Sequence, residues 1–170
     1  HHLPEQIETL AKHLDLEMFY EKEILETGGC LFNAASVLKT CDHFLVHNAD
    51  LIHTLDLQDL FAQHLASGSI ATLAGIHHSH HDTLCISRDG RLRGIRGYAG
   101  FEANEEDKIL TFSGIAFYRC DFLGLTSHGG VRRLQMDDGR RGVTHRPGVA
   151  VRGRPEAAPD VLPSRDGDCL

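Results

Sequence analysis

The stretch that decides the fold is His43–Asp50, which reads His-Phe-Leu-Val-His-Asn-Ala-Asp. Residues 44–46 are bulky and apolar, which is typical of a short strand buried on both faces of a sheet. The polar residues Asn48 and Asp50 follow, where the chain leaves this predicted strand. Because ligands bind beyond the carboxyl ends of the strands in open parallel sheets, we expect a binding site at this point.

A second polar turn lies upstream, at the start of a helix predicted over Gly29–Leu38. It consists of Glu26, Thr27, Gly28 and Gly29. Glycines let a ligand approach the backbone, and a helix amino terminus offers unpaired N–H groups. Two such turns would frame one crevice, in which the Asp50 carboxylate could hold Mg²⁺ against phosphate oxygens. The pair predicts a phosphorylated nucleotide ligand; the alternatives are a plain strand-to-helix connection and an aspartate that caps its own turn.

Helical and strand-like patterns alternate along the chain as far as residue 118. The predicted helices are Pro4–Leu14, Gly29–Leu38 and Leu57–Leu65, the last with Asp56 as its cap and Gly68 just past its end. The predicted strands are Leu16–Tyr20, the stretch ending at Asp50, Ser69–Ile76 and Leu110–Tyr118, with a hairpin around Arg88-Asp89-Gly90. This alternation predicts an α/β fold with a Rossmann-like, mostly parallel sheet and helices on both faces. The hairpin would be an inserted flap or a sheet edge.

Ser113 and Gly114 lie inside the predicted strand Leu110–Tyr118. Glycine weakens the interior of a strand unless a ligand or another backbone comes close to it. We therefore consider a ligand contact at this pair, with a bulge or backbone packing as the alternative.

The run His77-His78-Ser79-His80-His81 has the composition of a metal site, because imidazoles bind zinc, copper and nickel. Structural zinc sites, however, draw their ligands from separate elements and orient them with further hydrogen bonds. Consecutive histidines on one loop more often form a solvated cluster, so zinc binding is the weaker hypothesis.

Bulk composition excludes several classes of partner. The net charge of −7 disfavours non-specific nucleic-acid binding, which needs a basic surface. No apolar run approaches the roughly 20 residues that cross a bilayer, and no signal peptide is visible. The five cysteines are scattered without a Cys-x-x-Cys motif, which indicates free thiols. We expect a cytoplasmic protein without a nucleic-acid or membrane partner.

The last forty residues differ from the rest. From Val131 onward the basic side chains of the Lys/Arg class are all arginine, and lysine, phenylalanine and tyrosine are absent. Four of the five prolines of the chain also occur there. Such a segment cannot bury enough apolar surface to offset its ordering entropy. We therefore divide the chain into a partial domain over 1–125 and a low-complexity Arg/Gly/Pro tail over 126–170, which is disordered or read in a shifted frame.

Three motifs together resemble the sugar-1-phosphate nucleotidyltransferases. They are Leu25-Glu26-Thr27-Gly28-Gly29, the stretch from Phe44 to Asp50, and Phe112-Ser113-Gly114-Ile115. The branch that they resemble contains the mannose-1-phosphate guanylyltransferase-like and N-acetylmuramate-1-phosphate uridylyltransferase-like proteins. The resemblance extends from about His1 to Phe122.

The resemblance implies a Rossmann-like α/β sandwich that joins UTP or GTP to a sugar 1-phosphate and releases pyrophosphate, with Mg²⁺ as cofactor. Asp50 would be the catalytic Mg²⁺ ligand. The implied nucleotide-binding residues are Glu26, Thr27, Gly28, Gly29 and Asn48. The implied sugar-phosphate-binding residues are Ser113 and Gly114.

The chain also departs from the family pattern. Family members open with a glycine-rich loop that carries an arginine and is followed by a lysine, and they have a second acidic metal ligand beside a tryptophan. This sequence has neither feature, and Cys30 stands where a further glycine is usual. We expect an amino-terminally truncated fragment, with a shifted frame after about Phe122 and crippled catalysis. The alternative is a non-catalytic nucleotide-binding module, and the oligomeric state stays open.

Overall fold

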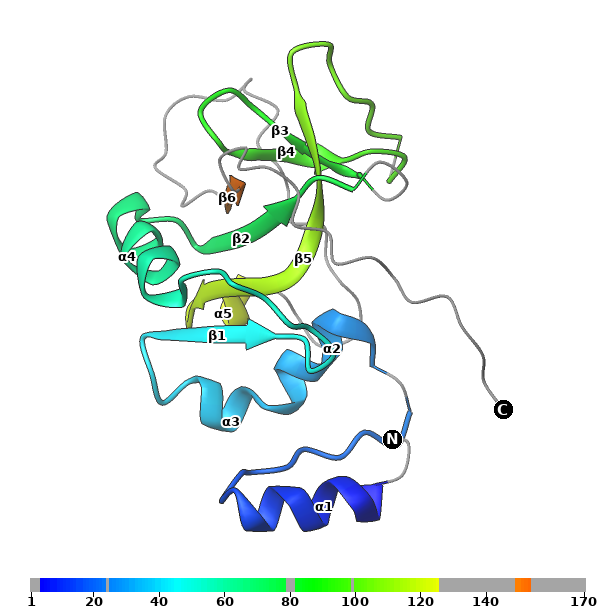
Figure 1. Ribbon diagram of the computed structural model, residues 1–170, viewed down its shortest axis with the longest axis vertical. Helices are drawn as coiled ribbons and strands as arrows, with labels where there is room; N and C mark the ends of the chain where they lie inside the picture. The colour runs from blue at the N-terminus through cyan, green and yellow to red at the C-terminus, as the bar shows by residue number, and fades with distance from the viewer. Residues whose placement is uncertain (1–3, 24, 79–81, 99, 126–148, 154–170) are drawn as a thin grey trace.

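The computed structural model describes residues 4–23, 25–78, 82–98 and 100–125, together with the backbone of 149–153; of Glu26 and Thr27 it describes the backbone only. Short helices and strands alternate along the chain (Figure 1). The helices are α1 (Pro4–His13), α2 (Glu26–Asn33), α3 (Ala35–Leu38), α4 (Leu57–Ser67) and α5 (Phe122–Leu125). The strands are β1 (His43–His47), β2 (Ala71–Ile76), β3 (Leu84–Ile86), β4 (Leu92–Ile95), β5 (Lys108–Arg119) and β6 (Val149–Gly153).

The long strand β5 organises the six-stranded sheet, because it pairs antiparallel with β1, β2 and β3. Strands β3 and β4 form an antiparallel hairpin, and β2 with β6 is the parallel pair among the described strands. The α/β class is therefore correct, but the prediction of a mostly parallel sheet is wrong. Strands β1 and β2 do run in the same direction, as a crossover through α4 requires, yet β5 returns between them and pairs with both.

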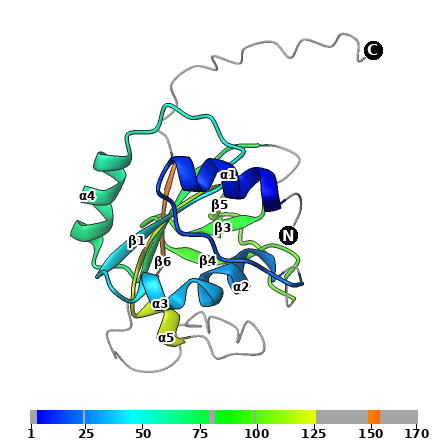
Figure 2. The ribbon, with the colours of Figure 1, turned by 90° about the horizontal axis from the view of Figure 1, so that it is seen from below.

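Helices cover both faces of the β1–β5 pair, as predicted. On one face Leu60 of α4 packs with Ile115 and Phe117 of β5. On the other face Leu31 of α2 packs with Phe44 of β1, joined by residues of α3 and α5. Figure 2 shows α4 on one side of the strands and α2 and α3 on the other.

The ends of α4 follow the predicted capping signals. The Asp56 carboxylate accepts hydrogen bonds from the N–H groups of Gln58 and Asp59, at 2.8 and 3.1 Å. Gly68 closes the helix with a left-handed φ of 60°, and its N–H donates to the Leu65 carbonyl. Both ends are therefore set by local side-chain and backbone chemistry.

The amino-terminal region differs from the prediction in two ways. The expected helix over Gly29–Leu38 instead begins at Glu26 and breaks at Ala34, where φ is −91° and ψ is 7°. The expected strand Leu16–Tyr20 does not form, because none of the described strands pairs with it and β1 pairs on one side only, with β5. Helix α1 lies apart from the sheet in Figure 1 and leaves the apolar side chains of Ile7, Leu10 and Leu14 exposed.

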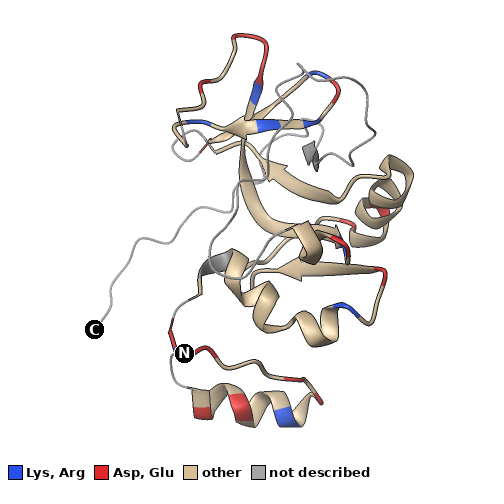
Figure 3. Cartoon of the chain, turned by 180° about the vertical axis from the view of Figure 1, so that it is seen from behind, with Lys and Arg blue, Asp and Glu red and all other residues tan. Residues whose placement is uncertain are grey.

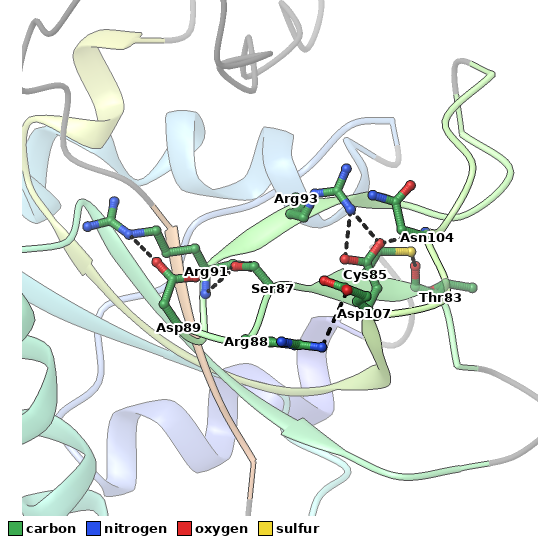
Figure 4. A network of polar contacts seen from close by, with 10 residues as sticks. Thr83, Cys85, Ser87, Arg88, Asp89, Arg91, Arg93, Asn104 and Asp107 are labelled. Atoms are coloured by element: carbon green, nitrogen blue, oxygen red, sulfur yellow. Dashed lines mark hydrogen bonds and ion pairs between the residues drawn. The ribbon is translucent and has the colours of Figure 1, made fainter.

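The predicted hairpin is confirmed and forms one edge of the sheet. Gly90 takes a φ of 82° in the turn, where the Ser87 N–H donates to the Arg91 carbonyl. Figure 3 shows a gathering of cationic residues on this part of the molecule. The Lys and Arg residues of this hairpin and the segments next to it are Arg88, Arg91, Arg93, Arg96 and Lys108. Three of these charges form ion pairs: Arg88 with Glu106, Arg91 with Asp89 and Arg93 with Asp107 (Figure 4).

Residues 149–153, in the predicted tail, form β6, and the prediction for the rest of the tail falls outside the described residues. Within the described part of the chain, no helix combines the length and apolar character that crossing a bilayer requires.

Candidate functional site at the carboxyl ends of β1 and β2

The topology brings the carboxyl ends of β1 and β2 to the same edge of the sheet. At these ends His47 pairs with Ile115 and Ile76 pairs with Thr111, so β1 finishes just past the middle of β5 and β2 finishes four residues nearer its amino end. In Figure 1 the arrows of β1 and β2 point in the same direction toward this edge. The loops that follow both strands therefore start from one side of the sheet, with β5 between them.

Asn48 and Gly114, two of the predicted site residues, are in direct contact. The Asn48 N–H donates to the Gly114 carbonyl at 3.0 Å. A Cβ atom added at Gly114 would lie 2.7 Å from Asn48 Nδ2 and 2.9 Å from Leu51 Cδ1, and φ at this glycine is +88°. Both the backbone conformation and the packing of Asn48 therefore require glycine at this position.

Ser113 lies in a bulge of β5. The register between β2 and β5 shifts between Leu73 and Gly75, opposite this part of β5. The Ser113 hydroxyl accepts a hydrogen bond from the Ile115 N–H at 3.3 Å. One alternative considered for the Ser113–Gly114 pair, a bulge, is thus present, and a ligand contact stays a prediction.

Asp50 lies in the turn after β1, where its side chain is exposed. It makes no hydrogen bond or ion pair with the described residues, so both carboxylate oxygens are available. Oxygen is the donor that Mg²⁺ prefers, and one carboxylate with water and substrate phosphates is a common way of binding this ion. The described residues contain no cluster of three or more His, Cys, Asp or Glu side chains that could hold a metal ion without such help.

The second predicted turn is helical. Gly28 and Gly29 lie in the first turns of α2, and the Gly29 N–H donates to the Leu25 carbonyl at 3.1 Å. Helix α2 packs beside β1, but no described contact joins these glycines to the turn after β1. The side chains of Glu26 and Thr27 fall outside the description, so the nucleotide-binding roles of all four residues stay predictions.

Two histidines missed by the sequence reasoning flank the Asp50 turn. Nε2 of His47 lies 3.0 Å from Nε2 of His53, His47 Nδ1 lies 2.6 Å from the Asn48 carbonyl oxygen, and the Leu55 N–H donates to His53 Nδ1. When both rings are neutral, these neighbours place the proton of His53 on Nε2 and that of His47 on Nδ1. The pair holds together the two ends of the loop that carries Asp50. Only the spacing of the histidines around this turn could have indicated it.

A third histidine, His77, is held in place directly after β2. Nδ1 of His77 lies 2.5 Å from Oδ2 of Asp82, a carboxylate whose side chain is only 7% exposed. Oδ1 of Asp82 accepts hydrogen bonds from the His78 N–H and the Thr111 hydroxyl. Burial by itself would raise the pKa of Asp82, but these hydrogen bonds and the His77 ring hold that pKa below its usual value of 3.8. Sequence reasoning considered zinc at this histidine run, of which residues 79–81 lie outside the described chain.

Comparison with known proteins shows a shared fold. No protein-family model and no curated protein matches the chain. HddC from Yersinia pseudotuberculosis has a similar structure, with a TM-score of 0.62 and 19% identity over 89% of this chain and 65% of HddC. The structure of HddC complexed with GMP-PN gives a TM-score of 0.61 and 18% identity over 90% of this chain and 66% of that one. The chain therefore spans about two thirds of the length of HddC, whose α/β fold it shares.

Proposed function

We propose that this chain is a nucleotidyltransferase domain that binds a nucleoside triphosphate at the edge formed by the ends of β1 and β2. The contact between Asn48 and Gly114, next to the exposed carboxylate of Asp50, is the observation that carries the proposal. The likeness in fold to HddC, which is known in complex with GMP-PN, supports a nucleotide ligand. UTP and GTP are the candidate nucleotides and a sugar 1-phosphate is the acceptor, so we assign the protein to the cytoplasm, where such substrates occur.

In the proposed reaction an oxygen of the sugar 1-phosphate attacks the α-phosphorus of the nucleotide. A new P–O bond forms while the bond to the β-phosphate oxygen breaks, and pyrophosphate leaves with that electron pair. Asp50 would hold Mg²⁺, which supplies charge neutralisation on the triphosphate. Asn48, Gly28 and Gly29 would bind the nucleotide, and the β5 bulge at Ser113–Gly114 would bind the sugar phosphate.

Calorimetric titration of the full chain with GTP and UTP, with Mg²⁺ or with EDTA, tests nucleotide binding. We expect Mg²⁺-dependent binding that Asp50→Asn weakens by roughly tenfold or more, because the metal loses its carboxylate ligand. Asp42→Asn is the matched control, since Asp42 is an exposed carboxylate at the opposite, amino end of β1. Equal affinity in wild type and Asp50→Asn would remove Asp50 from the site.

A non-catalytic nucleotide-binding module is the second candidate. It is favoured by the described residues, which contain no cluster of three or more His, Cys, Asp or Glu side chains that could hold a metal ion for catalysis. A coupled assay of pyrophosphate release with mannose 1-phosphate separates the two. Turnover that depends on the sugar phosphate establishes the transferase, and nucleotide binding without turnover establishes the module.

A further inference from the structure

We infer that His77 is a phosphate-binding residue at this edge of the sheet, and that Asp82 is the positioning residue that orients it. The inference deepens the proposed function and rests on it, because the ligand that fits is the phosphate group of the sugar 1-phosphate.

The carboxylate of Asp82 is buried and is held in place by several hydrogen bonds. Its residue is 6% exposed, and its two oxygens accept from three groups: the His77 ring, the His78 N–H and the Thr111 hydroxyl. The Arg96 guanidinium donates to the main-chain carbonyl of the same residue at 2.5 Å. The carboxylate therefore joins the end of the β2–β3 connection, where Asp82 lies, to the start of that connection and to β5. It cannot move without breaking several hydrogen bonds.

This arrangement fixes which ring atom of His77 can meet a ligand. Nδ1 is engaged by Asp82, while the side chain as a whole is 78% exposed, so Nε2 is the ring nitrogen left for a ligand. When the ring carries two protons, Nε2–H becomes a charged donor, and charge-assisted hydrogen bonds to phosphate are among the strongest in proteins. The charged group in contact with the ring is Asp82, whose carboxylate balances an imidazolium, and Arg96, which follows β4, binds the main-chain carbonyl of Asp82.

His77 also occupies the right place relative to the predicted sugar-phosphate residues. It follows Ile76 directly, and Ile76 pairs with Thr111, two residues before Ser113 on β5. Thr111 hydrogen-bonds Asp82, so the same stretch of β5 carries both the support of His77 and the bulge at Ser113–Gly114. A sugar phosphate at the bulge would be approached by Asp50 from the β1 side and by His77 from the β2 side.

The chemistry favours an anion over a metal ion. Zinc needs several protein ligands that converge on one point, and no cluster of three or more candidate ligands exists among the described residues. A phosphate oxygen, by contrast, is well served by one charged donor that is already oriented, with the remaining oxygens bound elsewhere at the edge.

The test is a titration of the full chain with mannose 1-phosphate, and separately with inorganic phosphate, at pH 6.0. Long-range ¹H–¹⁵N spectra report the His77 ring, and calorimetry gives the affinity. We expect the resonances of the His77 ring nitrogens to shift on addition of mannose 1-phosphate, because Nε2 meets the phosphate. His77→Gln should weaken binding at least about fivefold, because the charged donor is lost. The control is His13→Gln, at the end of the remote helix α1.

Asp82→Asn tests the positioning role and should weaken binding while changing the protonation pattern of the His77 ring. His77→Gln keeps the inference testable if the buried Asp82 variant does not fold. Unchanged affinity in His77→Gln, or a ring that does not respond to saturating mannose 1-phosphate, would overturn the inference. Equal binding of inorganic phosphate and mannose 1-phosphate would overturn the assignment to a sugar phosphate. Binding of mannose 1-phosphate through His77 without any binding of GTP or UTP would support His77 and refute the proposed nucleotide site.

Discussion

Nδ1 of His43 lies 3.0 Å from Nε2 of His64, which connects β1 to helix α4. The other nitrogen of His64 continues this chain to β2, since its Nδ1 lies 2.9 Å from the hydroxyl oxygen of Thr72. His64 and Thr72 are 1% and 0% exposed. A buried ring with both nitrogens engaged can have its hydrogen bonds satisfied while neutral, and burial disfavours the charged form that an added proton would create.

This buried chain predicts that acid destabilises the fold through His64. Burial, together with the charges of His43 and Arg119, lowers the pKa of His64 from its ordinary value of 6.5. The unfolded chain therefore binds a proton more readily than the folded one, so the free energy of unfolding should fall as the pH drops below about 6.5. Urea unfolding between pH 8 and pH 5 measures this slope.

His64→Gln is the informative variant, because an amide can hydrogen-bond both neighbours but does not titrate. We expect it to flatten the slope between pH 6.5 and pH 5, and an unchanged slope would assign the effect to other groups. The carboxylates of Asp82, Asp89 and Asp107 do not contribute to this slope, since their pKa values are lowered from 3.8. Their stabilisation is present above that value and is lost only when the pH falls below it.

Breaking the ion pair between Arg93 and Asp107 should lower the free energy of unfolding much more than breaking an exposed ion pair of the same region. One guanidinium nitrogen of Arg93 lies 2.7 and 2.8 Å from the two oxygens of Asp107, whose side chain is 3% exposed (Figure 4). Arg93→Ala leaves that carboxylate buried without its charged partner, which should cost about 3 kcal/mol of unfolding free energy. The control is Arg88→Ala, whose pair with Glu106 is exposed and should contribute less than about 1 kcal/mol.

A second variant shows whether the cost comes from the unpaired charge. Replacing both partners, as in Arg93→Met with Asp107→Leu, removes the charge and fills the space with apolar atoms. We expect this double variant to recover most of the lost stability, because apolar pairs often replace buried ion pairs without loss. If the double variant is less stable than Arg93→Ala, the ion pair itself provides the stability of the hairpin.

The His47–His53 contact predicts an effect on the Asp50 loop rather than on the whole fold. His53→Ala removes an exposed hydrogen bond and should lower the free energy of unfolding by only about 1 kcal/mol. It should, however, speed amide hydrogen exchange in residues 48–55, because the loop is no longer held at both ends. His13→Ala in helix α1 is the control. Exchange rates that stay the same in this loop would show that the pair does not order it.

Local signals in the sequence predicted those elements whose causes are local. The cap at Asp56, the left-handed Gly68 and the turn at Gly90 act within a few residues, and all three occur as expected. The prediction of a mostly parallel sheet was wrong because strand pairing depends on β5. This strand pairs antiparallel with β2 and β1, which lie about 40 and 70 residues earlier in the chain. The missing strand at Leu16–Tyr20 has the same cause, since an extended segment becomes a strand only where another strand pairs with it.

In the candidate site too, the sequence predicted the features with local causes and not those that depend on distant contacts. The polar turn after β1 was recognisable because an apolar run ends there in Asn48 and Asp50. The positioning contacts of His77 were not, because they join the loop after β2 to Thr111 on β5, some 30 residues later in the chain. A sequence shows that a histidine is present, whereas its tautomer and its free nitrogen follow from partners that only the folded chain brings together.

The strongest single test of the Asn48–Gly114 contact, at the sheet edge formed by the ends of β1 and β2, is Gly114→Ala. The new methyl group would sit 2.7 Å from Nδ2 and 2.8 Å from Cγ of Asn48, on a backbone with φ of +88° that alanine rarely adopts. The strain and the clash together should lower the free energy of unfolding by about 1–3 kcal/mol, as measured by urea denaturation. Gly124→Ala is the matched control, because no atom lies within 4 Å of its added Cβ and the residue is in helix α5.

The two variants also separate stability from binding. Under conditions where Gly114→Ala stays folded, the displaced Asn48 should weaken Mg²⁺-dependent nucleotide binding several-fold, while Gly124→Ala should bind as the wild type does. Wild-type affinity in a folded Gly114→Ala protein would show that the Asn48–Gly114 contact serves the bend in β5 alone. The proposed nucleotide site would then lose the observation on which it rests, and the close approach of the two residues would be explained entirely by the bulge.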